Sequence, residues 1–184
     1  MSDLLPTIET ERLRLRHLDL TDAGRLFTIF SDADVLRYYG MEPHTSSSET
    51  EQMLAGMIEG VESGAVIRWG IVTKETSDLI GTIGFHNRAP RHRRAEIGYE
   101  IHPDYWRHGY ATEALQAALT YAGQTGEMER IGAIVFTENI ASQQMLEKNG
   151  FSREGTLHRY MRQGDRAHDV HVYGYTTNKD HADT

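Results

Sequence analysis

The chain is built around the stretch Tyr105-Trp106-Arg107-His108-Gly109-Tyr110-Ala111-Thr112-Glu113-Ala114. It follows a strand-like run at residues 96–101 and leads into a helix-like run at residues 113–125. Gly109 can adopt backbone angles that are closed to other residues, and the small Ala111 leaves neighbouring N–H groups uncovered. The first N–H groups of a helix have no partner within it, and the helix dipole is positive there. The sequence therefore predicts an anion site at this turn, most naturally one for phosphate.

The simpler alternative is that this turn only joins a strand to a helix and binds nothing. Arg107 and His108 would add positive charge at the rim of a phosphate site. Two familiar phosphate loops are excluded, because the sequence contains neither G-x-G-x-x-G nor G-x-x-x-x-G-K-[ST]. Support for the phosphate interpretation must come from the rest of the chain.

Length, charge and cysteine content bound the class of protein. The 184 residues are enough for one domain with a substantial core, and we expect a single domain over residues 1–184. The net charge of −8 argues against direct binding of nucleic acid and suits a cationic substrate. The chain has no cysteine, which excludes disulfides, thiolate metal sites and a cysteine nucleophile.

Signals for export, membrane insertion and metal binding are missing from the sequence. Residues 1–11 are polar and acidic, unlike a signal peptide, and no apolar run is long enough to span a membrane. We therefore expect a cytoplasmic protein with no membrane partner. His168 and His171 are three apart on an expected strand and face opposite sides, and His86, His92, His102 and His108 lack metal-ligand spacing, so no metal is expected.

The N-terminal half is predicted to form a strand, two helices and an antiparallel meander. Polar and apolar residues alternate over 11–18, which indicates a half-buried strand. Helices are expected from Thr21 or Asp22 to about Ser31 and from about 46 to 63, separated by a short aromatic connection over 35–40. The strands of the meander are expected at 66–73, 79–86 and 95–101, with a basic loop at 87–94.

The C-terminal half completes a mixed α/β domain. The helix after the central stretch has an apolar face and ends at Gly123 and Gly126. The compact apolar run at 130–136 favours a strand buried on both faces, as in parallel pairing after a crossover helix. A further helix is expected at 139–149, followed by strands at 151–159 and 169–176 with a turn at Gly164-Asp165.

Three motifs in this order resemble a GNAT-type N-acetyltransferase: Trp106-x-x-Gly109-Tyr110-Ala111-Thr112-Glu113-Ala114, Asn139-x-x-Ser142, and Leu146-Glu147-Lys148-Asn149-Gly150-Phe151. The opening Glu9-Thr10-Glu11-Arg12-Leu13-Arg14-Leu15-Arg16 and the run Glu96-Ile97-Gly98-Tyr99 resemble the RimJ/RimL branch, a bacterial type that acetylates N-terminal amines of ribosomal proteins. The resemblance covers about residues 8–175. It implies a mixed, mainly antiparallel, twisted and splayed sheet of six or seven strands with about four flanking helices.

The same resemblance implies acetyl-CoA as co-substrate and assigns residues to it. The pyrophosphate would sit on the N–H groups from Arg107 to Thr112. The pantetheine arm would run between splayed strands, pairing with backbone near Tyr99, Glu100 and Ile101. Asn139 and Ser142 would reach the thioester end. The implied contacts are Tyr99, Ile101, Trp106, Arg107, His108, Gly109, Tyr110, Ala111, Thr112, Asn139 and Ser142.

Two positions bear on how closely the chain follows its branch. Many family members carry Arg or Gln three residues before the loop glycine, whereas Trp106 is usual in this branch. The branch often has an Arg–acid pair after its Gly-Thr-Leu, but here His158 and Arg159 follow Leu157. Substrate specificity therefore does not transfer with the family.

Acetyl transfer to an amine needs a group that takes the amine's proton and one that protonates the leaving thiolate. Glu96 is the first candidate base and Glu100 the second, since strand alternation puts both on one face with Gly98 between them. Either could instead face solvent or pair with Arg93 or Arg94. Ser142 could assist the sulfur or bond its own backbone, and Asn139 could cap its helix as well as touch CoA.

Two classes of function follow. The first is an acetyl-CoA-dependent N-acetyltransferase acting on the α-amine of a ribosomal or other protein, or on a small amine such as a polyamine, an amino acid or an antibiotic. The second is a non-catalytic CoA-binding regulatory domain with the same fold. The sequence leaves the acceptor amine open, and a homodimer is an open option.

Overall fold

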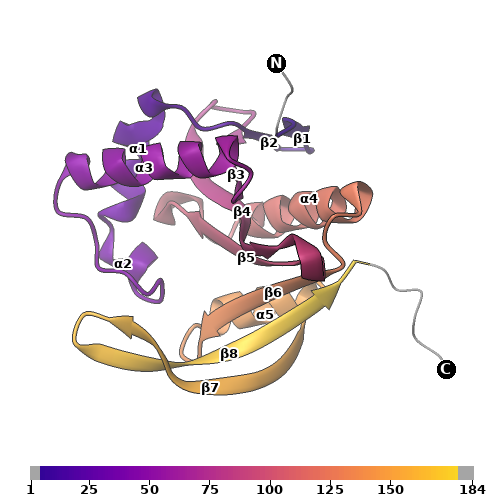
Figure 1. Ribbon diagram of the computed structural model, residues 1–184. Helices are drawn as coiled ribbons and strands as arrows, with labels where there is room; N and C mark the ends of the chain where they lie inside the picture. The colour runs from indigo at the N-terminus through magenta and orange to yellow at the C-terminus, as the bar shows by residue number, and fades with distance from the viewer. Residues whose placement is uncertain (1–4, 178–184) are drawn as a thin grey trace.

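The computed structural model describes residues 5–177, and within them one mixed sheet of eight strands is flanked by five α-helices (Figure 1). The expected mixed, mainly antiparallel α/β fold is confirmed, with eight strands in place of six or seven. The strands are β1 Ile8–Glu9, β2 Leu13–Arg16, β3 Ile67–Thr73, β4 Leu79–Ala89, β5 Arg94–Ile101, β6 Arg130–Phe136, β7 Ser152–Gln163 and β8 Arg166–Thr176. The helices are α1 Ala23–Phe30, α2 Ala33–Leu36, α3 Ser47–Glu62, α4 Tyr110–Thr125 and α5 Ile140–Lys148.

The sheet consists of two antiparallel parts joined by one short parallel contact. Its strand order is β1-β2-β3-β4-β5-β6-β8-β7, and only β5 and β6 run parallel. The parallel register covers Arg94↔Arg130, Ala95↔Ile131 and Glu96↔Gly132. Beyond Glu96 the two strands continue without pairing to each other, so the sheet splays at the C-terminal ends of β5 and β6.

The two faces of the sheet carry separate hydrophobic clusters because neighbouring strand residues point to opposite sides. Trp69 and Ile83 face α4 and pack with Leu115 in the larger cluster. Val72 joins the cluster that α1 and α3 form through residues such as Leu54. Figure 1 shows α3 on one side of the strands and α4 and α5 on the other. A group that lies in the gap between the C-terminal ends of β5 and β6 can therefore be reached from both faces of the sheet.

Three local differences from the predicted elements have clear causes. The β7–β8 hairpin extends to Gln163↔Arg166, because Gly164, at φ 55°, makes a two-residue turn that keeps the strands paired. Residues 33–36, within and just before the expected connection, form α2, since the Asp32 side chain accepts bonds from the amides of Asp34 and Val35. The two-residue β1 was too short for a periodic signal.

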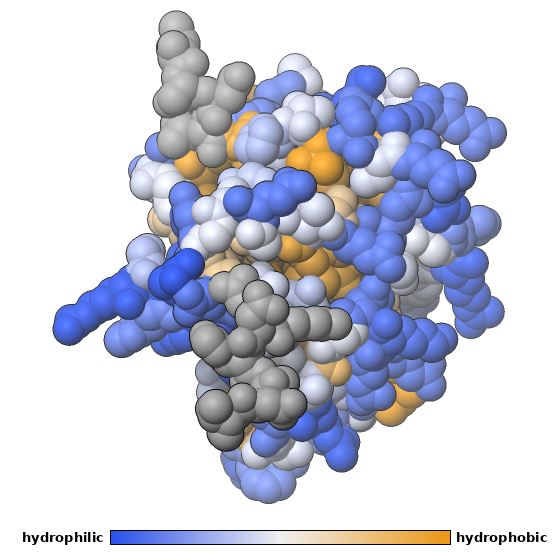
Figure 2. Space-filling model, turned by 90° about the vertical axis from the view of Figure 1, so that its right-hand side faces the viewer, coloured by the Kyte–Doolittle hydropathy of each residue, from blue (hydrophilic) through white to orange (hydrophobic). Residues whose placement is uncertain are grey.

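The surface is mainly polar. Figure 2 shows one face on which hydrophilic side chains surround smaller apolar areas. None of the helices in the described part of the chain is long and apolar enough to cross a membrane.

Candidate active site

A cleft of about 1470 Å³ opens where β5 and β6 separate. Its walls come from β5, the loop that follows it, β6, the start of α5, the segment around α2, and β7. Candidate site residues in this lining are Glu96, Tyr99, Glu100, Ile101, Trp106, Arg107, Gly109, Tyr110, Ala111, Thr112, Asn139 and Ser142. His108 is not among the described residues that line the cleft; its ring stacks on Tyr110.

The loop before α4 has the geometry of an anion cradle. Gly109 has φ 79° and occupies the N-cap position, a left-handed conformation that favours glycine. Arg107 is also left-handed, at φ 61°. The Glu113 amide is bonded to the Gly109 carbonyl at 3.0 Å, so the amides at 110–112 precede the first helical bond. These N–H groups and the positive helix end suit a phosphate group.

Arg12 braces this loop from β2's N-terminal side. Its Nε donates to Glu113 Oε2 at 2.7 Å, and its Nη1 donates to the His108 carbonyl at 2.7 Å. The guanidinium also lies 4.5 Å from the centroid of the Tyr110 ring. Partial burial opposes ionisation of Glu113, yet the bonds from Thr10 and Arg12 hold the pKa of Glu113 below its ordinary value. Sequence reasoning missed Arg12 as a site residue, because about a hundred residues separate it from the loop.

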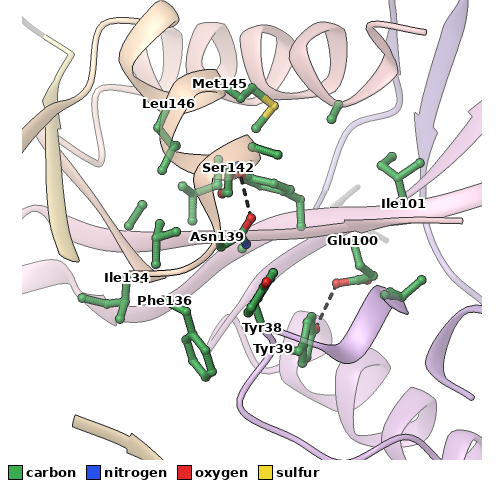
Figure 3. Close-up of a pocket in the computed structure, with 18 of the residues that line it drawn as sticks. Tyr38, Tyr39, Glu100, Ile101, Ile134, Phe136, Asn139, Ser142, Met145 and Leu146 are labelled. Carbon is green, nitrogen blue, oxygen red and sulfur yellow. Dashed lines mark hydrogen bonds between the residues drawn. The ribbon is translucent and has the colours of Figure 1, made fainter. Parts of the chain in front are cut away.

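On the face of the sheet that carries α4 and α5, Ser142 and Tyr99 form a hydroxyl pair. Ser142 Oγ lies 2.6 Å from Tyr99 Oη. Asn139 is the N-cap of α5, and its side chain accepts a bond from the Ser142 amide at 3.3 Å (Figure 3). Burial raises the pKa of Tyr99 to about 12, so the phenol keeps its proton at neutral pH. The Ser142 hydroxyl thus meets a protonated phenol in the cleft.

Glu96 lies on the opposite face of β5. Its side chain is 23% exposed, Asn87 Nδ2 donates to Oε2 at 3.0 Å, and His86 Nε2 lies 3.5 Å from the same oxygen. The hydrogen bond from His86, helped by Asn87, holds the pKa of Glu96 below its ordinary value although burial opposes this. Arg93, one of the partners considered for it, pairs with Glu129 instead. Glu96 is therefore a partly accessible, ionised carboxylate.

Glu100 shares the face of Glu96 but is enclosed. Its side chain is 1% exposed and forms an ion pair with Arg68 at 2.7 Å. Tyr39 Oη donates to Glu100 Oε2 at 2.9 Å (Figure 3), and Thr82 Oγ1 donates to Oε1. Arg68 Nε in turn donates to Thr82 at 2.8 Å. The Glu100 carboxylate is already satisfied by protein groups.

A contact at the end of β5 bears on where the cofactor arm could bind. Trp106 Nε1 donates to the Ile101 carbonyl at 2.7 Å, so this carbonyl already has a partner at the end of β5.

The histidines considered as metal ligands are placed differently. His168 stacks on Phe136 with ring centroids 4.8 Å apart. Within residues 5–177, no group of three or more metal-binding side chains is gathered.

Comparison with known proteins identifies a family and several relatives of this chain. The family described as "Acetyltransferase (GNAT) domain" matches residues 12–152. An uncharacterized N-acetyltransferase, YoaA of Bacillus subtilis, is 44% identical over 92% of this chain and 96% of its own. The ribosomal-protein-serine acetyltransferase of Escherichia coli is 34% identical over 52% of this chain and 54% of its own. The structure of RimL, a ribosomal L7/L12 α-N-protein acetyltransferase, in complex with coenzyme A has the same fold, with a TM-score of 0.83, 23% identity, and coverage of 93% and 98%.

Proposed function

The chain belongs to the GNAT acetyltransferase family, and we propose that its cleft brings acetyl-CoA and a primary amine together from opposite faces of the sheet. The family relationship makes it an N-acetyltransferase that uses acetyl-CoA. The observation that carries the proposal is that the Tyr99–Ser142 pair and Glu96 lie on different faces of β5 yet line one cleft. An acetyl donor held on one side of the sheet and an amine on the other can react only in the gap between β5 and β6.

The groups that would hold CoA fit its chemistry. The amides at 110–112, at the positive end of α4, suit the pyrophosphate, and a side chain at Gly109 would fill their cradle and approach Arg12 to 3.3 Å. Backbone of β5 beyond Glu96 has no strand partner on the β6 side, which leaves room for an extended arm to pair there. Since the Ile101 carbonyl already accepts a bond from Trp106, and Glu100 pairs with Thr82 of β4, Tyr99 is the better backbone partner.

We assign proton removal to Glu96 and a supporting role to Glu100. An ionised, partly exposed carboxylate attracts an ammonium group and can accept its proton as the nitrogen attacks the thioester carbonyl. Glu100 is bound by Arg68, Tyr39 and Thr82, so it has no free position for that proton. The C–S bond breaks as the C–N bond forms. Ser142 gives its proton to the departing sulfur, the adjacent Tyr99 hydroxyl replaces it, and water returns a proton to Tyr99.

The acceptor that we propose is the N-terminal α-amine of a protein or peptide. Similarity to the ribosomal-protein-serine acetyltransferase of E. coli supports this choice. An α-amine has a pKa of about 8, so near neutral pH a larger fraction is uncharged than for a lysine side chain with a pKa of about 10.4. A small primary amine is the second candidate, favoured by the partly exposed carboxylate of Glu96 on the acceptor face.

The test is turnover of acetyl-CoA with a panel of peptides and small amines, measured as release of free thiol and as acetylated product by mass spectrometry. We expect acetylation of peptide α-amines. Acetylation of small amines alone would favour the second candidate, and no thiol release with any amine would refute the proposed chemistry.

A further inference from the structure

Residues 36–40 cross the cleft between the two parts of the splayed sheet, and we name them the bridging segment. The segment begins at Leu36, the last residue of α2, and its Tyr38 and Tyr39 line the cleft. Figure 3 shows both tyrosines beside Glu100 and Phe136, on the side of the cleft away from Ser142. We propose that Gln163 fixes the bridging segment over the acceptor side and thereby restricts the enzyme to amines on slender chain ends. The inference rests on the proposed function.

Both ends of the bridging segment are held by a single side chain of β7. Gln163 Nε2 donates to the Leu36 carbonyl at 2.7 Å, and the Gly40 amide donates to Gln163 Oε1 at 3.0 Å. Both ends of the Gln163 amide are therefore used, and they clamp the first and last residues of the bridging segment. A side chain at Gly40, where φ is 84°, would collide with Met161 of β7.

The middle of the bridging segment is held by the buried cluster on β5. Tyr39 Oη donates to Glu100, whose ion pair with Arg68 lies almost completely out of water. Tyr38 also packs edge-on against Phe136 of β6, with ring centroids 6.3 Å apart. The bridging segment is thus fixed to both β5 and the β6–β8–β7 part, across the gap that the strands leave open.

A clamp at both ends limits the shape of the acceptor. The bridging segment and β7 present to the cleft the aromatic or thioether side chains of Tyr38, Tyr39, Tyr160 and Met161, together with the charged side chain of Arg37. Tyr39 is held by its bond to Glu100 and Tyr38 by its packing on Phe136, so these two rings do not make room for extra carbon without displacement of the bridging segment. An amine on an unbranched or small residue can pass beside them toward Glu96, whereas an amine on a β-branched residue meets fixed rings.

The experiment compares two peptides that differ only in an N-terminal Ala or Ile, with wild type, Gln163→Ala and Gln116→Ala. Gln116 is the matched control, because its side chain bonds Asn149 on the surface and is not part of the cleft lining. We expect wild type to prefer the Ala peptide by at least about tenfold in kcat/KM, within the range for added methylene groups. Gln163→Ala should lose most of this preference by gaining activity on the Ile peptide, with KM for acetyl-CoA unchanged, and Gln116→Ala should resemble wild type.

The rate of hydrogen exchange at the Gly40 amide measures, independently of activity, whether Gln163 holds the bridging segment. Exchange should be faster in Gln163→Ala and unchanged in Gln116→Ala. Gln163→Glu, which keeps an acceptor for Gly40 but cannot donate to Leu36, should give intermediate exchange and intermediate selectivity. Unchanged selectivity or unchanged exchange in Gln163→Ala would overturn the inference alone. Wild-type protein that acetylates no amine would overturn the proposed function, and the acceptor inference with it.

Discussion

Ser142 Oγ and Tyr99 Oη lie 2.6 Å apart, joining α5 to β5 across the splay. The two residues are 43 positions apart in sequence, so their contact depends on how α5 packs against β5. Because Tyr99 is buried and its pKa is raised to about 12, it stays protonated beside Ser142 at neutral pH. The pair therefore holds hydroxyl protons that a departing thiolate can accept, although the raised pKa makes the phenol a weaker acid than a free tyrosine.

If the pair assists the leaving thiolate, Ser142→Ala and Tyr99→Phe should each lower kcat by roughly ten- to a hundredfold, toward the low end of acid–base effects. CoA affinity, measured by calorimetry, should change little. The double variant should lose little more than either single variant, because groups that act as a unit are not additive. An equal loss of kcat and affinity, or no loss in either, would assign the pair to structure alone.

Glu96→Gln should lower kcat/KM at neutral pH by about a hundredfold, within the usual range for a general base. The deficit should shrink as pH rises past the amine's pKa of about 8, where the amine loses its proton unaided. Wild-type rate should rise with pH and then level off. A pH–rate profile for both proteins, with CoA affinity as control, checks this.

Changes in folding stability that involve Glu96 should not alter the pH–rate profile in the neutral and alkaline range. The pKa of Glu96 is lowered in the folded protein, so its contribution to stability is present above the unfolded value of about 4.3 and is lost as pH falls through the folded value. The neutral and alkaline range lies above both values. If Glu96→Gln keeps full activity while a folded Glu100→Gln loses it, the base is Glu100, and if neither matters, water takes the proton.

Gly109→Val should weaken CoA binding by at least about tenfold, because a β-branched residue at φ 79° costs about 1–3 kcal/mol and fills the cradle. Calorimetry measures the affinity, and circular dichroism checks that the variant is folded. Gly123→Ala is the control: Gly123 lies inside α4 with open space around it, so alanine should leave affinity unchanged. Normal CoA binding by folded Gly109→Val would rule out the loop as the phosphate site.

Arg12→Ala should weaken CoA binding by roughly tenfold, which corresponds to about 1.4 kcal/mol, with a smaller effect on kcat. The reason is that Arg12 holds the His108 carbonyl and Glu113 on the two sides of Gly109. Arg14→Ala is matched to it, since Arg14 is an exposed arginine of β2, two residues along the chain, that pairs only with Glu9 among the described residues. Similar affinities for the two variants would show that the brace does not position the loop.

Much of the fold could be predicted because its signals are local. The strand–turn–helix around Gly109, the meander of β3, β4 and β5, and the parallel placement of β6 follow from periodicity, turn residues and an uninterrupted apolar run. The order of motifs indicated the family, which the comparisons confirm. The assignment of individual site residues stays a prediction that the variants above test.

The sequence by itself determined most of the strands and helices, though not β1 or α2, that a glycine turn precedes α4, and which residues are candidates for chemistry. These properties depend on backbone preference and on spacing within about ten residues. Only the tertiary structure decided which candidate carboxylate is free. Glu96 and Glu100 have the same strand and face, but Arg68, Tyr39 and Thr82 reach only Glu100. The roles of Arg12 and Gln163 likewise depend on partners about a hundred residues away, because side-chain contacts across a sheet leave no periodic trace in a single sequence.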